Sequence, residues 1–443
     1  MSEEGLFASK AKGLYKKLCQ DEWNTNTVGI IVGLFTVLIM AWWRPWGAVG
    51  AVRNWGEWIL HGLGVVSHTP KQALISSGSV IGIGFVAGAF ISANLGSNFA
   101  VRIPPYLEMC KAVMAGIFMG VGAALAGGCN VGGFYCAIGN LSASGFAMWL
   151  GLIIGAVTGL KYLYWEMEHV SWGSGGAKTF EVPKGLQILL GIIAIIALVW
   201  GAYKYSASGA SYTASLGGLM MISAVLGYSM QRGRWCMIQG FREPHMTGDC
   251  KMAKSVALSV CIVAIGTAVL KYPVPQRLIN VRYAFSDVVS AVQNTNDNVD
   301  MDEVMDNLDY PSDANVLQKS IPVLAKSNYV RSTFGWGGVV GGIIFGIGAM
   351  LAGGCGTGTL WRVGEGQIKL WIVVPFFGIS NALMTNWFNA RHFEASGKLG
   401  SFVYMPDTFL GYGGSLLVIF LVMGAWYMVV DWNEDSNKLI VDM

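Results

Sequence analysis

Two cysteines end the same apolar, glycine-rich segment. GIFMGVGAALAGGC, residues 116–129, returns 226 positions later as GIIFGIGAMLAGGC, residues 342–355, with ten of fourteen positions identical. Small residues that let membrane helices pack closely explain the glycines, but they do not explain a cysteine at the same place in both copies. A thiol is a soft, polarizable group with a weak S–H donor. We therefore treat Cys129 and Cys355 as candidate binding residues.

A third cysteine lies among cations in GYSMQRGRWCMIQGFRE, residues 227–243. Arg232 and Arg234 precede Cys236, and Arg242 follows it. Cations at a membrane boundary would attract an anion before it enters the protein. The alternative is that these arginines only extend toward lipid headgroups. We include Cys236 and Arg234 in the candidate site.

A glycine-dense tract follows each repeated cysteine, NVGGFYCAIGN after the first and GTGTLWRVGEG after the second. Such tracts are not expected to continue as lipid-facing helix, so they predict broken or re-entrant helices. The exposed N–H groups of a broken helix carry about half a positive charge and can hold an anion. Gly128 and Gly354 would let the anion approach the backbone beside Asn130. Together with the thiols, this favours a sulfur-containing anion over phosphate.

The remaining cysteines give little support for a metal site or a cofactor. None of the eight cysteines forms a CxxC pair, and the five histidines are scattered, so we expect no zinc, iron–sulfur or haem group. Cys129 and Cys136 are seven residues apart and form an alternative redox pair. The role of Cys250, in the polar loop HMTGDC, stays open. Three others look like apolar filler: Cys19, Cys110 and Cys261.

The elements that must position these residues are membrane helices. Mean hydropathy is +0.50, 53% of residues are hydrophobic and 12% are charged, about half the charge of a soluble chain. Apolar runs of about 20 residues, the length that crosses a bilayer, recur along the chain. The expected spans are 27–43, 74–93, 107–128, 145–164, 185–203, 213–230, 252–272, 334–353, 367–387 and 409–430.

Four of these spans lie between the two Gly-Gly-Cys copies, so the copies should enter the membrane from opposite faces. The expected fold is an all-α polytopic membrane protein of about ten transmembrane helices, with an inverted internal repeat and broken or re-entrant helices. Secondary transporters use such repeats, and their substrate sites lie where discontinuous helices end.

Five regions are expected along the chain. They are an N-terminal extension (1–26), a membrane domain with the first repeat and Cys236 (27–272), an acidic insert (273–331), a membrane domain with the second repeat (332–430) and a polar tail (431–443). The lysines of the extension favour a cytoplasmic N-terminus. The insert is either a solvated loop or a docking surface. A net charge of +3 without a basic tract gives no sign of nucleic acid.

The repeated GxxxGxGxxLAGGC segments, the Arg-x-Cys of 234–236 and the VGEGQ after Cys355 resemble the YeeE/YedE sulfur transport family. The resemblance implies a multi-pass transporter of the cytoplasmic (inner) membrane that passes thiosulfate along three cysteines, here Cys129, Cys236 and Cys355. The chain departs from the family in its insert and its N-terminal extension. It also has Ser97 roughly where the second half has Cys236. A selenium compound therefore stays an alternative substrate.

Two mechanisms follow from the thiols. In a relay, protonated thiols donate successive hydrogen bonds to the substrate, because burial disfavours a thiolate. In a covalent mechanism, a thiolate attacks the substrate and forms a persulfide. We favour the relay and expect no enzymatic activity. The alternative function is a membrane subunit of a sulfur or selenium redox or processing complex. A cytoplasmic sulfur-carrier protein or another membrane-complex subunit is then an alternative partner besides the anion and the bilayer.

Overall fold

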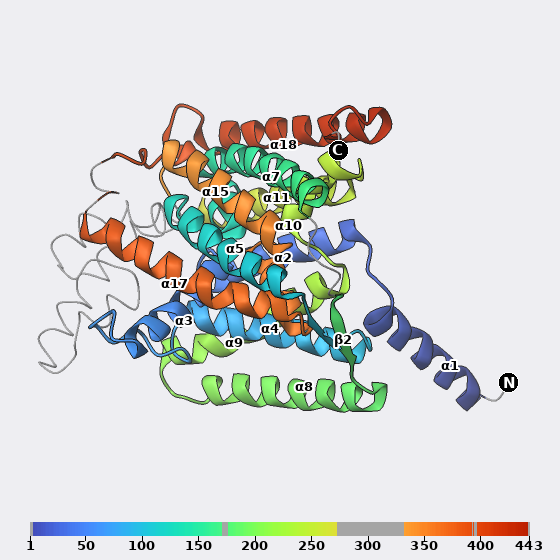
Figure 1. Ribbon diagram of the computed structural model, residues 1–443. Helices are drawn as coiled ribbons and strands as arrows, with labels where there is room; N and C mark the ends of the chain where they lie inside the picture. The colour runs from blue at the N-terminus through green and yellow to red at the C-terminus, as the bar shows by residue number, and fades with distance from the viewer. Residues whose placement is uncertain (1–2, 171–175, 273–331, 392, 394–396, 442–443) are drawn as a thin grey trace, which may run out of the picture.

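The computed structural model describes residues 3–170, 176–272, 332–391, 393 and 397–441. Ten helices among them are long and apolar enough to cross a membrane, which confirms the all-α polytopic fold (Figure 1). The expected insert, 273–331, lies outside the described residues. The ten helices are α2 (Thr25–Trp42), α4 (Ser77–Leu95), α5 (Tyr106–Leu125), α7 (Ser144–His169), α8 (Lys184–Ser206), α9 (Ser211–Arg232), α11 (Lys251–Lys271), α15 (Trp336–Ala352), α17 (Ile368–Ala390) and α18 (Gly411–Ser436).

Short helices lie between the long ones. They are α3 (Ala48–Gly62), the π-helical turn η2 (Asn130–Tyr135) with α6 (Cys136–Gly139), α10 (Met237–Met246) and α16 (Gly356–Gly364). The broken helices expected after the Gly-Gly-Cys segments are thus present. The sequence did not predict α3, because Arg53, Asn54, Glu57 and His61 make it too polar for an apolar-run criterion.

The order of elements occurs twice. The series α2, α3, α4, α5, η2–α6, α7, α8 is followed by α9, α10, α11, α15, α16, α17, α18. The packing repeats as well, because α4 packs on α9 as α11 packs on α2, and α7 packs on α15 as α17 packs on α5. In this order Gly47, the N-cap of α3, takes the place of Cys236, the N-cap of α10. The expected match of Ser97 with Cys236 is therefore corrected.

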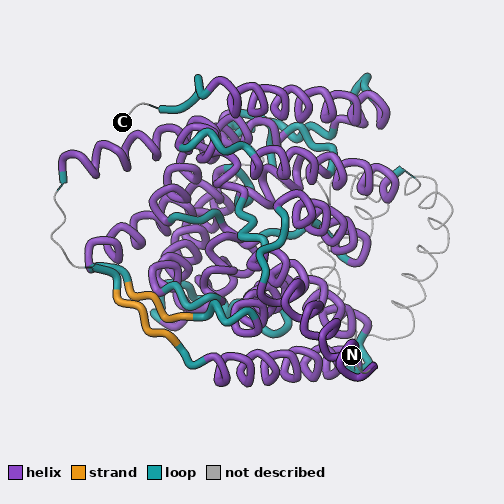
Figure 2. The backbone as a smooth tube through the Cα atoms, turned by 90° about the vertical axis from the view of Figure 1, so that its right-hand side faces the viewer, coloured by secondary structure: helices purple, strands orange, loops and turns teal. Residues whose placement is uncertain are grey.

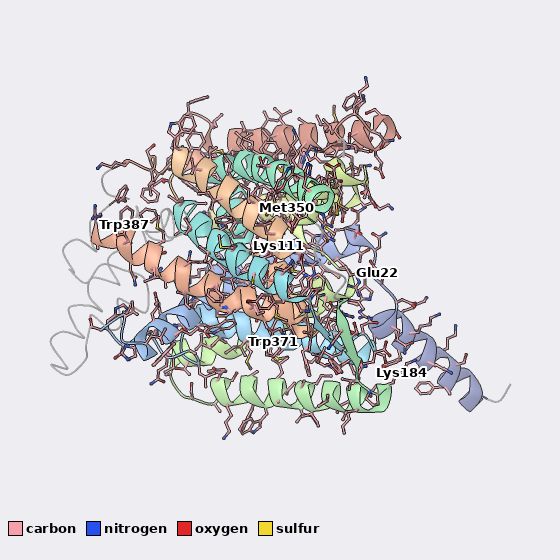
Figure 3. All side chains as sticks on the ribbon, in the orientation of Figure 1. Glu22, Lys111, Lys184, Met350, Trp371 and Trp387 are labelled. Atoms are coloured by element: carbon pink, nitrogen blue, oxygen red, sulfur yellow. The ribbon has the colours of Figure 1, made fainter. Side chains whose placement is uncertain are left out.

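The two copies of the repeated segment run antiparallel where they pack. A Cβ at Gly341 of α15 would lie 2.6 Å from the backbone nitrogen of Ala126, just past the end of α5. A Cβ at Gly348 would lie 2.9 Å from the carbonyl oxygen of Ala115. Figure 3 shows Lys111, from the start of α5, near Met350, from the end of α15. The glycines allow this close approach, and the inversion of the repeat across a bilayer stays a prediction.

Two faces of the bundle can be named from α2. At the Thr25 face, Trp23 N–H donates to Arg232 O over 3.3 Å. At the opposite Trp42 face, Trp42 Nε1 donates to Ser215 O over 3.1 Å. These contacts place the end of α9 at the Thr25 face and its start at the Trp42 face.

The N-terminal extension forms two short helices, α1 (Glu3–Tyr15) and η1 (Lys16–Gln20). Tyr15 Oη joins this segment to the bundle by donating to Leu95 O over 2.7 Å. Two four-residue strands, β1 (Ala100–Ile103) and β2 (Lys178–Glu181), pair antiparallel with Ala100 opposite Glu181, and Figure 2 shows them in orange. This small ribbon connects helices and leaves the bundle helical.

The outer helices α8 and α18 lie at opposite margins of the bundle in Figure 1. Their outward side chains are large and apolar, and Ile196 of α8 and Met428 of α18 are 63% and 69% exposed. A bilayer is the solvent in which such surfaces are stable. The chain is therefore a multi-pass membrane protein.

Candidate thiol-lined transport site

Each Gly-Gly-Cys segment forms the same turn. Gly127 follows α5 with φ +71°, and Gly353 follows α15 with φ +79°. The next N–H closes the helix end, as Gly128 donates to Ala123 O over 2.9 Å and Gly354 donates to Ala349 O over 3.1 Å. Glycine adopts this left-handed conformation without a Cβ penalty. The first glycine of each pair is therefore needed to stop the helix and turn the chain.

The turn places each repeated cysteine at the start of a short helix. Cys129 has φ −71° and ψ 179°, and Cys355 has φ −72° and ψ −179°. Their carbonyl oxygens accept from Gly133 and Thr359 over 2.6 and 2.7 Å. Both cysteines are N-cap residues, so their thiols lie beside the positive ends of η2 and α16.

Cys236 holds the same position on α10, although the turn before it has a different sequence. Arg234 has φ +48°, and Trp235 N–H donates to Met230 O over 2.9 Å. An arginine thus occupies the left-handed position that glycine holds in the other two turns. The Gly-Gly-Cys pattern does not predict this third turn, because the left-handed residue that the pattern marks as glycine is an arginine here.

The three predicted cysteines converge, although 226 residues separate the first from the last. Cys236 Sγ donates to Cys355 Sγ over 3.4 Å. A Cβ on Gly356 would lie 3.3 Å from Cys129 Sγ, so the third thiol reaches the start of α16 from the other side. All three thiols are fully buried, and none of them forms a disulfide. The start of α16 therefore lies between the thiol of the first copy and those of the second.

Backbone and amide groups complete this centre. Asn130 Oδ1 accepts from Gly356 N–H over 3.3 Å, which ties the first copy to the second. Cys355 Sγ accepts from Gly358 N–H over 3.3 Å. Gly128 and Gly354 have no side chain, so the turns approach the helix starts closely. A Cβ on Gly128 would lie 2.6 Å from Gly133 N, and the matched atom on Gly354 would lie 2.6 Å from Arg362 Nη1.

A cavity of about 210 Å³ reaches Cys129. Its walls include Cys136, Asn140 and the cations Arg44 and Arg53. Arg44 Nη2 donates to Ser77 Oγ over 3.1 Å, and Arg53 Nε lies 2.8 Å from Glu57 Oε1. Because Arg44 follows the end of α2, this cavity belongs to the Trp42 face.

The starts of α3 and η2 meet beside Cys129 at this cavity. A Cβ on Gly47, the N-cap of α3, would lie 3.3 Å from Gly132 N and 3.5 Å from Cys129 Sγ. Two helix starts therefore lie beside one thiol, which suits an anion that enters between Arg44 and Arg53. Cys236 and Cys355 are not among the described residues that line this cavity.

A larger cavity of about 1030 Å³ lies between α4, α8, α9, α16 and α17. Its lining is almost entirely apolar, with Phe90, Leu198 and Met220 among the side chains. An apolar wall offers an anion no compensation for lost hydration. The smaller, charged cavity is therefore the candidate substrate site.

Arg234 is the predicted site residue that lies away from the thiols. Its Nη2 is 3.5 Å from Glu365 Oε1, and its side chain is 46% exposed. Glu365 is fully buried and also accepts from Gln231 and Gln367 over 2.8 and 3.1 Å. Because Gln231 is next to Arg232 at the end of α9, this ion pair belongs to the Thr25 face. The sequence motif VGEGQ thus supplies the partner of Arg234.

Arg362 was not predicted. It is seven residues after Cys355, and its Nη1 donates to Gly353 O over 2.5 Å. Its guanidinium also stacks on the Trp361 ring at 4.5 Å. The sequence spacing could have indicated that Arg362 lies on the same side of a helix as Cys355, because Cys355, Gly358 and Arg362 follow one helical face.

The other cysteines are dispersed. Cys19 and Cys261 are half-buried and Cys110 is exposed, whereas Cys250 is fully buried and burial raises the pKa of its thiol. Cys136 lines the same cavity as Cys129, so the alternative of a redox pair stays open. Across the described parts of the chain, no three His, Cys, Asp or Glu side chains lie close enough to share a metal ion.

Comparisons with known proteins identify the family and several relatives of the chain. The sulphur transport family matches residues 2–158 and 316–441. The probable transporter YedE of Salmonella typhimurium strain LT2 is 24% identical over 406 residues, which are 88% of this chain and 87% of that relative. The thiosulfate transporter TsuA of Escherichia coli K12 is 28% identical over 228 residues, which are 50% of this chain and 49% of TsuA. The chain therefore belongs to the sulphur transport family and is a membrane transporter for a sulfur compound, not an enzyme.

Proposed function

We propose that this protein carries thiosulfate across the cytoplasmic membrane along the three thiols. The observation that carries the proposal is the convergence of Cys129, Cys236 and Cys355 at the starts of three short helices. Two of these thiols are 3.4 Å apart, and the third touches the helix that begins at Cys355. The likeness to the thiosulfate transporter TsuA supports the choice of substrate.

The proposed path begins in the cavity of the Trp42 face. Arg44 and Arg53 attract the dianion, and the starts of α3 and η2 beside Cys129 replace part of its hydration. The anion then passes to Cys355 and Cys236 and leaves toward Arg234 at the Thr25 face. With the N-terminal lysines on the cytoplasmic side, this direction is uptake, driven by consumption of sulfur inside the cell.

Selectivity comes from the terminal sulfur of the substrate. Helix starts and arginines attract sulfate as well as thiosulfate, since both are dianions of similar shape. Sulfur is softer and less strongly hydrated than oxygen, so passing three thiols costs thiosulfate less free energy. A tenfold preference needs only about 1.4 kcal/mol.

Labelled thiosulfate uptake into proteoliposomes tests the proposal. We expect unlabelled thiosulfate to compete strongly, and sulfate to need at least a tenfold higher concentration. Equal competition by sulfate would contradict thiol selection. Stronger competition by selenite would favour the selenium alternative, and a visible absorption band of the purified protein would favour the redox-complex alternative.

The relay and the covalent mechanism differ in the mass of the loaded protein. A relay of hydrogen bonds leaves no adduct, so we expect the unmodified mass after incubation with thiosulfate. In the covalent mechanism a thiolate attacks the outer sulfur of thiosulfate, the sulfur–sulfur bond breaks and sulfite leaves, so a persulfide on Cys129, Cys236 or Cys355 would favour that mechanism.

A further inference from the structure

Arg362 lies one helical turn beyond Gly358, on the face of α16 that meets the inner thiols. A Cβ on Gly358 would lie 2.5 Å from Cys236 Sγ, 3.3 Å from Cys355 Sγ and 3.5 Å from Arg362 Nη1. One point on α16 is therefore surrounded by two thiols and a guanidinium. Gly358 leaves this point free of a side chain.

The position of Arg362 is fixed from two sides. Its Nη1 donates to Gly353 O over 2.5 Å, and its guanidinium stacks on Trp361 at 4.5 Å. A guanidinium has five N–H donors, so this geometry leaves donors for another acceptor. The bond to Gly353 also steadies the turn that carries Cys355.

No carboxylate in the described part of the chain lies within ion-pair distance of Arg362, although Glu243, which pairs with Arg242 at 3.5 Å, is near enough to interact with its charge. Arg234 and Arg102 both lie within ion-pair distance of Glu365, at 3.5 and 3.8 Å. None of the ion pairs between described residues includes Arg362. A dianion that loses its hydration inside the bundle needs such a cation, because helix starts supply only partial charges.

The first copy of the repeat lacks this cation. Cys136 follows Cys129 by seven residues, as Arg362 follows Cys355. Cys136 carries no positive charge and lines the outer cavity, where Arg44 and Arg53 are the cations. The two copies thus differ in charge at the matched position.

We infer that Arg362 is the cation that binds the substrate dianion at the inner pair Cys236 and Cys355. This inference rests on the proposed function and adds the residue that sets the charge preference of the inner site. Arg362 then distinguishes doubly charged from singly charged sulfur anions, while the thiols recognise the sulfur.

The test compares R362Q and R362K with the unmodified protein in proteoliposomes. Thiosulfate, a dianion, and thiocyanate, a monoanion with a terminal sulfur, are the two probes. We expect R362Q to raise the half-saturation concentration for thiosulfate at least about tenfold, the usual worth of a hydrogen bond to a charged group. The inhibition constant of thiocyanate should change less than threefold, and R362K should recover part of the thiosulfate affinity.

Arg391 is the matched control, because its guanidinium stacks on Trp387 at 5.1 Å beyond the end of α17. R391Q should leave both anions unaffected. An unchanged half-saturation for thiosulfate in R362Q would overturn the inference. Equal weakening of both anions would also overturn it, since that result indicates a structural role alone.

Binding is read separately as the rise in melting temperature that thiosulfate produces in detergent-solubilised protein. A rise in the unmodified protein without uptake would contradict the proposed function, and its loss in R362Q would still support the role of Arg362. Uptake with an equal rise in both proteins would contradict the role of Arg362 alone. No rise and no uptake in the unmodified protein would contradict both.

Discussion

The substitution Gly358→Ala adds one methyl group at the point where the inner thiols meet. Two effects oppose each other there. Alanine is the better helix former in α16 by as much as about 1 kcal/mol. The new Cβ, however, would lie 2.5 Å from Cys236 Sγ, although non-bonded heavy atoms prefer a separation of about 3.5–4.0 Å.

The steric effect should win. Overpacking of this kind costs about 1–3 kcal/mol, so the net loss of stability is small beside a total of about 5–15 kcal/mol. The protein should therefore fold, with Cys236 displaced by about 1 Å or more. Because displacements of that size can reduce rates about 100-fold, we expect uptake to fall at least about tenfold.

A glycine away from the site provides the control. Gly424 lies within α18, as Gly358 lies within α16, but a Cβ on Gly424 would meet no atom within 4 Å. Thermal unfolding and labelled thiosulfate uptake should be measured for G358A, G424A and the double variant G358A/C236G. G424A should retain uptake, and C236G should restore stability to G358A without restoring transport. If G358A is as stable and as active as the unmodified protein, the described thiol geometry is wrong.

Two further predictions concern the turn and the charges that hold the bundle. G353A should lower the free energy of unfolding by about 1 kcal/mol, because Gly353 has φ +79° and no atom lies within 4 Å of its Cβ position. G353N should lose less, since asparagine tolerates this conformation. Equal loss in both variants, measured by thermal unfolding, would indicate crowding instead of backbone strain. K111M should lower the free energy of unfolding by about 3 kcal/mol, because Lys111 Nζ lies 2.7 Å from Glu166 Oε1 and the Glu166 side chain is only 3% exposed. The double variant K111M/E166Q should recover part of this loss in thermal unfolding. No recovery would exclude the ion pair as the cause.

The broken helices could be predicted because their signal is local. A glycine pair that ends an apolar run stops a helix by adopting a left-handed conformation, and the next residue starts another helix. The repetition of this pattern also predicts that Cys129 and Cys355 lie at helix breaks, and both are the N-cap residues of short helices in the structure. Ten long apolar runs predict the helical architecture for the same reason.

Local patterns of this kind do not predict contacts between residues that are far apart in the sequence. Cys236 and Cys355 are 119 residues apart, and their contact depends on how α9, α10 and α16 pack. The same packing pairs Arg234 with Glu365, which moves a predicted site cation away from the thiols. It also gives Arg362 its place, since the turn at Gly353 brings the guanidinium back to the start of α16.

If the thiols of the repeat form the substrate path, their removal must stop transport, and the initial rate of labelled thiosulfate uptake is the measurement that shows this. Proteoliposomes should contain equal amounts of folded C129A, C355A or the control C110A, whose cysteine is exposed on the outside of α5. Alanine preserves a small apolar side chain, so folding should survive. Uptake should fall to near the protein-free background in C129A and C355A and keep its full rate in C110A. Full uptake by C129A and C355A would refute a substrate path along these thiols.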